Sequence, residues 1–270
     1  MNKESVLITG SDGVVGSYID FGIHTDRSML DVTNLSNVMD VCKKHMPKKI
    51  IHLAAATDLA WCEKEPAQAH FINAVGAYHM ALAAREIGAK LIYVSTSGVF
   101  DGTKKEPYTE EDMPEPVNVY GHSKYLGELA VAGVLSDYLI VRTSWVFGGG
   151  KGKDTKFVGK IMSQIKSPEI KAVTDKHGSP TYAKDLAQAI KKLIEEDARG
   201  IIHLGGGKAT RFEVAKEIIS IVGSTTSVLP VTSDDFPSIY ISGENESMAA
   251  SAYMRPWQEA LRDYIKNEWQ

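Results

Sequence analysis

A tyrosine and a lysine lie four residues apart in the stretch NVYGHSKYLGE, residues 118–128. On a helix this spacing places Tyr120 and Lys124 on one face, because residues i and i+4 stack one turn apart. An ammonium group beside a phenol favours the phenolate, so the pair predicts a tyrosine of lowered pKa that can give and take a proton. The alternative is an ordinary exposed helix pair, and these two residues alone do not decide between the interpretations.

Hydroxyl groups at the end of an apolar run favour the catalytic interpretation. KLIYVS, residues 90–95, has the continuous apolar character of a strand buried on both faces, and Thr96 and Ser97 follow it directly. Functional residues of parallel α/β sheets gather at the carboxyl ends of the strands. We therefore expect this strand end to lie beside Tyr120.

Three glycines follow the first apolar run. VLIT, residues 6–9, precedes Gly10, Gly13 and Gly16 in the spacing GxxGxxG. Glycine permits a sharp turn and a close approach of the backbone to a pyrophosphate, and the helix that follows offers unpaired N–H groups to the anion. The motif predicts a dinucleotide site, with a simple tight turn as the alternative.

The segment after the glycines is short. Only six residues separate Gly16 from IHTD at residues 23–26, so the first helix is expected to be clipped to one or two turns if GIHT is the second strand. Asp26 could hold the adenosine ribose of NAD, and Arg27 could hold the extra phosphate of NADP. Both could equally be surface loop charges, so the sequence leaves the choice between NADH and NADPH open.

Strand and helix patterns alternate through the first half of the chain. This order predicts an α/β fold with a Rossmann-type, doubly wound parallel sheet. The apolar runs lie at residues 5–9, 49–54, 90–95 and 137–144, and helical patterns lie at 34–45 and 66–88.

The second half is less regular. We expect a NAD(P)-binding Rossmann domain over residues 1–148 and a smaller, mainly substrate-binding lobe over 149–270, with elements around 180–204 returning to the sheet. The glycine-rich FGGGKGKD, residues 147–154, is predicted to be a loop. The amphipathic pattern at 183–196 predicts a helix that packs on the sheet.

Composition narrows the function classes. The 270 residues carry 30 Lys and Arg against 34 Asp and Glu, a net charge of -4 that argues against nucleic-acid or membrane-surface partners. The few cysteines and the absence of a signal-peptide pattern predict a cytoplasmic protein. Eight histidines without paired spacing predict no metal site. GGGKAT, residues 205–210, lacks the Ser or Thr of a phosphate loop and is interpreted as a turn.

The order of glycine triplet, Ser/Thr strand end and Tyr-x-x-x-Lys resembles the extended short-chain dehydrogenase/reductase family, and more closely its dTDP-4-dehydrorhamnose reductase-like group. The resemblance covers most of the chain. The segments that carry it are LDVTN, HLAAATD, FINAVGA, STSGVFDG, NVYGHSKYLGE, VRTSWVFG, HGSPTYAKDLAQAI and RPWQEALRDYI.

The resemblance implies an NAD(P)-dependent oxidoreductase that reduces a keto group on a nucleotide-activated deoxysugar, in the synthesis of polysaccharide precursors. Tyr120 would protonate the carbonyl oxygen, Lys124 would hold the nicotinamide ribose and tune Tyr120, and Thr96 would hydrogen-bond the same oxygen. A homodimer is an open expectation. The implied cofactor contacts are Gly10, Gly13, Val14, Val15 and Gly16 at the pyrophosphate, Asp31 and Val32 at the adenine, and Ala54, Ala55 and Ala56 at the central stretch.

The departures from this group fall on the substrate side. Ser97-Gly98 replaces the usual Asp-Tyr, Leu59-Ala60-Trp61 replaces Val-Asp-Lys, and an Arg-Pro usual ahead of the final helices is missing from residues 235–251. Trp145 either borders the substrate or belongs to the core. Lost polar partners change specificity. A cofactor-binding regulatory subunit without chemistry of its own, or a nucleotide-sugar epimerase or dehydratase, therefore remain alternatives.

Overall fold

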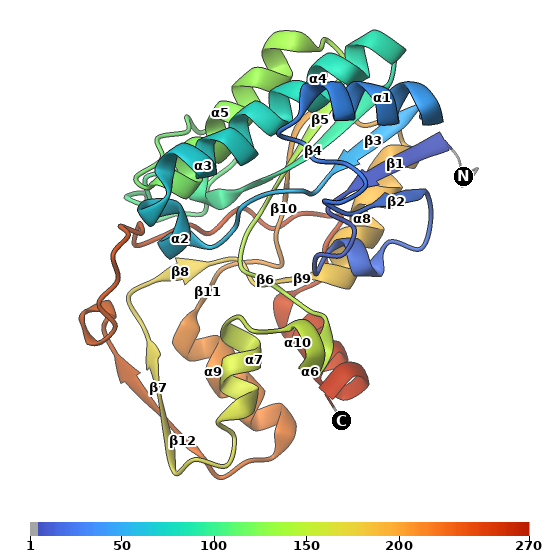
Figure 1. Ribbon diagram of the computed structural model, residues 1–270. Helices are drawn as coiled ribbons and strands as arrows, with labels where there is room; N and C mark the ends of the chain where they lie inside the picture. Colours follow the sequence, from blue (N-terminus) through green and yellow to red (C-terminus); the bar gives the residue numbers. More distant parts are fainter. Residues whose placement is uncertain (1–4, 270) are drawn as a thin grey trace.

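A parallel six-stranded sheet forms the centre of the computed structural model, which describes residues 5–269 (Figure 1). The strand order is β10-β5-β4-β3-β1-β2, and every neighbouring pair is parallel. The predicted doubly wound sheet is confirmed. The strands are β1 (Val6–Thr9), β2 (Ile23–Thr25), β3 (Lys49–His52), β4 (Lys90–Thr96), β5 (Tyr138–Thr143) and β10 (Gly200–Leu204).

The strand order reverses between β1 and β3. The chain first moves outward from β1 to β2 and then returns to add β3, β4 and β5 on the other side. Such a switch point opens a crevice at the carboxyl ends of the strands, where α/β proteins bind ligands. Gly10 directly follows β1 at this crevice.

Three long helices cover one face of the sheet (Figure 1). They are α1 (Leu35–His45), α4 (Gly76–Ile87) and α5 (Val119–Val134). Asn34 caps α1 by accepting from the Asn37 amide, and Gly88 ends α4 with a φ of 67°. The pattern at 66–88 is therefore helical as expected, although it is divided into α3 (Pro66–His70), the π-helical η3 (Phe71–Val75) and α4.

The other face is covered by α8 (Ala183–Glu195), whose Leu186, Ile190 and Leu193 are fully buried against the sheet. The expected amphipathic helix is thus confirmed, and β10 follows it into the sheet beside β5. The first helix is only the 3-10 turn η2 (Gly16–Tyr18), and GIHT contains β2 as expected.

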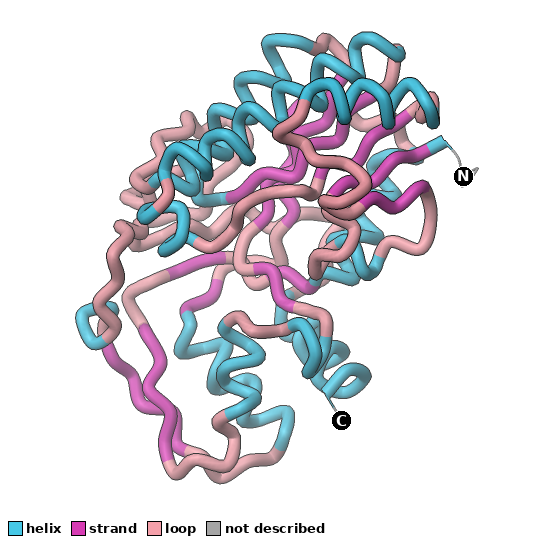
Figure 2. Tube along the Cα trace, viewed as in Figure 1, coloured by secondary structure: helices cyan, strands magenta, loops and turns pink. Residues whose placement is uncertain are grey.

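A second hydrophobic core lies below the sheet in Figure 1. The tube in Figure 2 shows that long loop segments connect its short strands. FGGGKGKD includes the helical turn α6 (Gly150–Lys153) where a loop was expected, and Gly148, Gly149 and Gly150 lead into this turn with positive φ angles that glycine tolerates. The other elements are α2 (Leu59–Lys64), η4 (Ser97–Val99), β6 (Val146–Phe147), α7 (Phe157–Ser163), β7 (Glu169–Val173), β8 (His177–Gly178), β9 (Thr181–Tyr182), β11 (Ala209–Thr210), α9 (Arg211–Val222), β12 (Ser227–Val231), η5 (Ser233–Asp235), α10 (Trp257–Tyr264) and η6 (Ile265–Trp269).

A buried polar network joins the end of the chain to the segment after the glycine loop. Tyr18 Oη donates to Glu268 Oε2 at 2.5 Å and accepts from the Gly149 amide at 2.6 Å, while the Tyr182 phenol donates to the other Glu268 oxygen. Burial, followed by the hydrogen bond to Glu268, raises the pKa of both tyrosines. These contacts attach η2, and with it the glycine loop, to the second core.

Within residues 5–269 no helix has the length and apolar character needed to cross a bilayer. The same residues contain no group of three or more His, Cys, Asp or Glu side chains placed to hold a metal ion.

Candidate active site

A cavity of about 2050 Å³ extends from the carboxyl edge of the sheet to the second core. The part formed by the glycine loop, Ala54–Ala56 and the Thr96, Tyr120 and Lys124 side chains is called the cofactor half, because the sequence predicts cofactor contacts there. The part formed by Trp145, Lys176, Arg211 and Glu246 is called the substrate half, because Trp145 is the residue predicted to border the substrate. Every site residue predicted from the sequence lines this cavity except Asp26: Gly10, Gly13, Val14, Val15, Gly16, Arg27, Asp31, Val32, Ala54, Ala55, Ala56, Trp61, Thr96, Ser97, Tyr120, Lys124 and Trp145.

Two of the three loop glycines occupy positions that no larger residue fits. Gly10 has a φ of 66°, and a Cβ built on it would lie 2.7 Å from the Ala54 amide nitrogen. A Cβ on Gly16 would lie 2.5 Å from the backbone of Ser11. Because both obstacles are main chain, only glycine at position 10 lets the loop pass close to Ala54, and only glycine at position 16 lets the loop fold back on Ser11. This leaves exposed backbone in the cavity, as a dinucleotide pyrophosphate requires.

The two charges after β2 face different surroundings. The Asp26 carboxylate accepts hydrogen bonds from the Ser28 amide and hydroxyl and from the Met29 amide, at 2.6 to 3.0 Å, and these bonds lower its pKa. Asp26 therefore closes a local turn and is not brought into the cavity lining. Arg27 is exposed and does line the cavity.

Tyr120 lies at the start of α5, which begins directly against the turn after β4. Asn118 caps the helix by accepting from the Gly121 amide at 2.8 Å. A Cβ on Gly121 would lie 1.9 Å from the Gly98 carbonyl oxygen, so glycine allows the helix to touch this turn. Tyr120 consequently meets Thr96. Burial raises the pKa of Tyr120 to about 12, although the hydrogen bond with Thr96 acts in the lowering direction.

Lys124 lies one turn further along α5, with its side chain buried. Its Nζ donates to the Val94 carbonyl at 2.8 Å and lies 4.0 Å from the ring centroid of Tyr93. Burial lowers the pKa of Lys124 to about 7. The expected lowering of the Tyr120 pKa by Lys124 does not appear in the chain by itself, because burial dominates both groups and the ammonium is directed toward Val94.

Two buried contacts hold α5 in place. Glu128 on α5 forms a double hydrogen bond with Arg142 on β5, with 2.6 Å between Nη2 and Oε2, and both side chains are almost completely buried. Asn73 exchanges hydrogen bonds with the Ala56 backbone and also donates to the Ser123 hydroxyl at 2.9 Å. Asn73 therefore fastens the Ala54–Ala56 stretch to the helix of Tyr120. The sequence reasoning missed Asn73, although FINAVGA belongs to the segments that carry the family resemblance.

Trp145 is held on the substrate side by unusual backbone geometry. Its φ of 43° is rare for a residue with a large side chain, and a Cβ built on Gly178 would lie 2.1 Å from the indole. The Arg211 guanidinium lies 3.5 Å from the centroid of the Trp145 ring and 4.7 Å from that of Phe157. Trp145 therefore lines the cavity, and a contact between its indole and the substrate stays a prediction.

The other substrate-side residues lie on different elements. Ser97 is buried, and its hydroxyl donates to the Ser144 hydroxyl at 2.9 Å. Trp61 lies on α2 with 37% of its surface exposed. A Cβ on Gly98 would lie 3.4 Å from Thr96 Oγ1 and 3.8 Å from the Tyr120 ring, so this glycine leaves room directly beside these two side chains.

Three charged residues of the substrate half, Lys176, Arg211 and Glu246, were missed by the sequence reasoning. Arg211 opens α9 directly after the capping residue Thr210, and this N-cap pattern was a usable signal for a helix start. Glu246 lies in an irregular segment, and no local pattern marks it. Burial raises the pKa of the Glu246 carboxyl, while Arg211 and Lys176 act to lower it.

Comparisons with known proteins agree with this geometry. The sequence matches the family described as "RmlD substrate binding domain" over residues 4–269. The spore coat polysaccharide biosynthesis protein SpsK of Bacillus subtilis is 34% identical over 97% of this chain and 96% of its own length. The dTDP-4-dehydrorhamnose reductase of Mycobacterium tuberculosis is 35% identical over 96% of this chain and 91% of its own.

The chain is also similar in structure to a solved dTDP-4-dehydrorhamnose reductase. The dTDP-4-dehydrorhamnose reductase of Bacillus anthracis in complex with NADP superposes with a TM-score of 0.92, at 36% identity over 98% of this chain and 99% of that one. A family match over nearly the whole chain and relatives above 30% identity lead to one assignment. The chain belongs to the RmlD family, and its relatives include proteins named dTDP-4-dehydrorhamnose reductase.

Proposed function

We propose that this protein is an NAD(P)H-dependent reductase of a keto group on a nucleotide-activated deoxysugar. The observation that carries the proposal is the meeting of Thr96, Tyr120 and Lys124 in one cavity with the glycine loop. Family membership supports it, because relatives that match most of the chain are named dTDP-4-dehydrorhamnose reductase and dTDP-4-keto-6-deoxy-D-glucose reductase.

The cavity fits a bound dinucleotide. Gly10 and Gly16 bring bare backbone to the carboxyl end of β1, and Ala54–Ala56 continue this wall without bulky side chains. NAD(P)H bound there supplies the hydride. Arg27 lines the cavity while the Asp26 carboxylate is occupied by its own turn, and this arrangement favours NADPH over NADH.

In the proposed reaction, Tyr120 donates its phenolic proton to the carbonyl oxygen of the sugar. The raised pKa keeps the phenol protonated at neutral pH, so the proton is present when it is needed. Thr96 hydrogen-bonds the same oxygen and holds it toward Tyr120. Lys124 would hold the nicotinamide ribose from the cavity wall, where its ammonium also donates to the Val94 carbonyl.

The direct test supplies NADPH or NADH with a panel of nucleotide-linked 4-keto-6-deoxysugars and follows cofactor oxidation. We expect turnover of at least one sugar and a higher kcat/KM with NADPH than with NADH. Cofactor binding without turnover of any sugar would contradict the proposal. In that case the regulatory-subunit alternative predicts a stable partner enzyme whose activity changes on binding.

A further inference from the structure

Glu246 is a carboxylate in the cavity without a partner in the described chain. Its side chain is half-buried and lines the cavity, yet within residues 5–269 it forms no hydrogen bond and no ion pair. A carboxylate removed from water without hydrogen bonds costs free energy, and a ligand that donates to it recovers this cost. The residue is therefore open to a donor group of a bound molecule.

The position of Glu246 is defined by three short segments that lie side by side. Residue His177 of β8 exchanges two backbone hydrogen bonds with Glu244 and Glu246, both of 2.8 Å. On its other edge β8 pairs with β11, where His177 lies opposite Thr210. Arg211 follows Thr210, so Glu246 and Arg211 stand on the two sides of β8.

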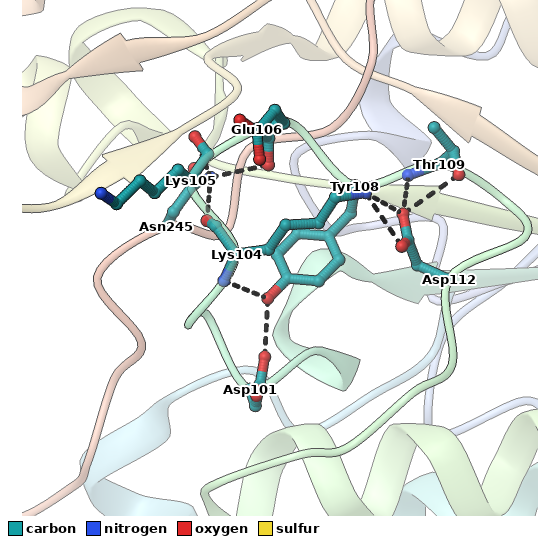
Figure 3. Close-up of polar contacts among 8 residues, drawn as sticks. All are labelled: Asp101, Lys104, Lys105, Glu106, Tyr108, Thr109, Asp112 and Asn245. Atoms are coloured by element: carbon teal, nitrogen blue, oxygen red, sulfur yellow. Dashed lines mark hydrogen bonds and ion pairs between the residues drawn. The ribbon is translucent and has the colours of Figure 1, made fainter.

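Asn245 fixes the segment that carries Glu246. Its side-chain amide donates to the carbonyl oxygens of Lys104, Lys105 and Glu106 at 2.7 to 3.2 Å (Figure 3), and its oxygen accepts from the Ser247 hydroxyl at 2.6 Å. Asn245 itself is only 3% exposed. Because these hydrogen bonds hold Asn245 in place, the backbone of the adjacent Glu246 is also held at the cavity wall.

The loop that receives Asn245 is itself braced. Tyr108 donates to Asp101 at 2.6 Å, and Asp112 accepts from both Thr109 and the Lys104 ammonium (Figure 3). Tyr108 also stacks on the Phe100 ring at a centroid distance of 4.2 Å. The Glu246 segment therefore rests on a rigid support that begins at the end of β4, the strand of Thr96.

The charges around Glu246 restrict the kind of donor that fits. Arg211 and Lys176 both act electrostatically on its carboxyl, and Glu246 in turn acts on the Tyr120 phenol. Neither cation forms an ion pair with Glu246 in the described residues, so the carboxylate keeps its accepting positions. A cationic amine would meet repulsion from two positive groups, whereas a neutral hydroxyl would not.

We propose that Glu246 determines substrate specificity by accepting a hydrogen bond from a sugar hydroxyl adjacent to the carbonyl that Tyr120 protonates. This inference rests on the proposed reductase function. It assigns to Glu246 a substrate contact on the wall opposite the cofactor, and it restricts the substrate to sugars that keep this hydroxyl free.

The experiment compares two substrates and three variants. The substrates are a dTDP-linked 4-keto-6-deoxyhexose and its 3-deoxy analogue, and the variants are Glu246→Ala, Glu246→Gln and the control Glu244→Ala. Glu244 lies two residues away, is exposed and does not line the cavity. The wild type is expected to prefer the hydroxylated sugar by about 10- to 100-fold in kcat/KM, the usual range for a hydrogen bond to a charged group.

Glu246→Ala is expected to remove this preference by slowing only the hydroxylated sugar, and Glu246→Gln to lower it partly, while NADPH affinity and the Glu244→Ala enzyme stay at wild-type values. An unchanged preference in Glu246→Ala would overturn the inference and leave the reductase function standing. An equal loss with both sugars would also overturn it.

The same comparison is made by calorimetry with the corresponding dTDP-6-deoxyhexoses, which carry no keto group. If the wild type reduces neither keto sugar, the reductase function fails, but the ratio of the two dissociation constants still decides on Glu246. A ratio that Glu246→Ala does not change, or a failure of both sugars to bind, would refute the Glu246 contact.

Discussion

The cofactor half of the cavity rests on the carboxyl ends of the parallel strands of the central sheet, whereas the substrate half is assembled from β8, β11 and a segment with no regular structure. In the first, backbone hydrogen bonds along the whole sheet fix where Thr96 and Gly10 lie. In the second, position depends on side-chain contacts such as Arg211 on Trp145 and Asn245 on the loop after β4. Under the proposed function, this difference means that the reacting groups are placed by the sheet, whereas the choice of sugar depends on a few side-chain contacts.

The largest effect is expected where the two halves meet, at the phenol of Tyr120. Tyr120→Phe removes the proton donor and keeps the ring, so kcat should fall about 1000-fold, within the range of general acid catalysis. NADPH affinity should stay within about threefold. Tyr125→Phe on the same helix is the control, because Tyr125 packs beside Phe100 and does not line the cavity. Equal activities of the two variants would remove Tyr120 from the mechanism.

The second prediction concerns the buried amine in the cofactor half. The pKa of Lys124 is about 7 in the folded chain against 10.5 for an ordinary lysine, because burial disfavours its charged form. Between these values the unfolded chain binds more protons, so the wild type should gain stability as pH rises, by up to about 1.4 kcal/mol per pH unit. Below pH 7 both states are protonated and this dependence ends.

Denaturant unfolding of wild type and Lys124→Met between pH 6 and 9 measures this dependence. The difference in unfolding free energy between the two proteins should change in favour of the wild type from pH 7 upward and be flat below it. Parallel curves across the whole range would mean that Lys124 stays charged in the folded protein.

The third prediction concerns a substitution that impairs only the cofactor half. In Gly10→Ala the added Cβ meets the Ala54 backbone and the positive φ is strained, so NADPH affinity should fall about 30-fold. The nucleotide-sugar dissociation constant, measured without NADPH, should stay within about twofold. Gly133→Ala is the matched control, since nothing lies within 4 Å of its Cβ. A parallel loss of both affinities would mean that the two halves are not separable.

The fourth prediction, with the smallest expected effect, weakens the substrate half and leaves the cofactor half unchanged. Arg211→Ala removes the guanidinium from Trp145 and a cation from the substrate half, so nucleotide-sugar affinity should fall about tenfold, in line with one desolvated cation–π contact. NADPH affinity should not change, and Arg211→Lys should fall between the two. Calorimetry with each ligand separately provides the measurement, and a loss of NADPH affinity would contradict the division.

The same division explains what the sequence could predict. The glycine loop, the Thr96 strand end and the Tyr120–Lys124 pair are local patterns whose place in a parallel sheet follows from the order of elements. Glu246 has no such pattern, since its position depends on Asn245 and β8 rather than on its own neighbours. Tertiary contacts of this kind leave no local trace in a single sequence.

The structure differs from the sequence-based predictions at two further points, Asp26 and the Tyr120–Lys124 pair. Asp26 and Arg27 carry the charges expected near a cofactor ribose. The Asp26 carboxylate, however, accepts hydrogen bonds from the Ser28 and Met29 amides and closes a local turn, so it does not face the cavity. The i, i+4 spacing placed Lys124 and Tyr120 on one face correctly. It did not account for burial, which disfavours the charged form of each group and so raises the pKa of Tyr120 and lowers the pKa of Lys124.

The hydrogen bond between Tyr18 and Glu268 joins residues 250 positions apart in the chain. Contacts between such distant residues form late in folding, because the entropy of closing the intervening chain must be overcome first. The glycine loop itself follows β1, whereas its attachment to the second core needs residues from both ends of the chain. We therefore expect the loop to be fixed against the second core only late in folding.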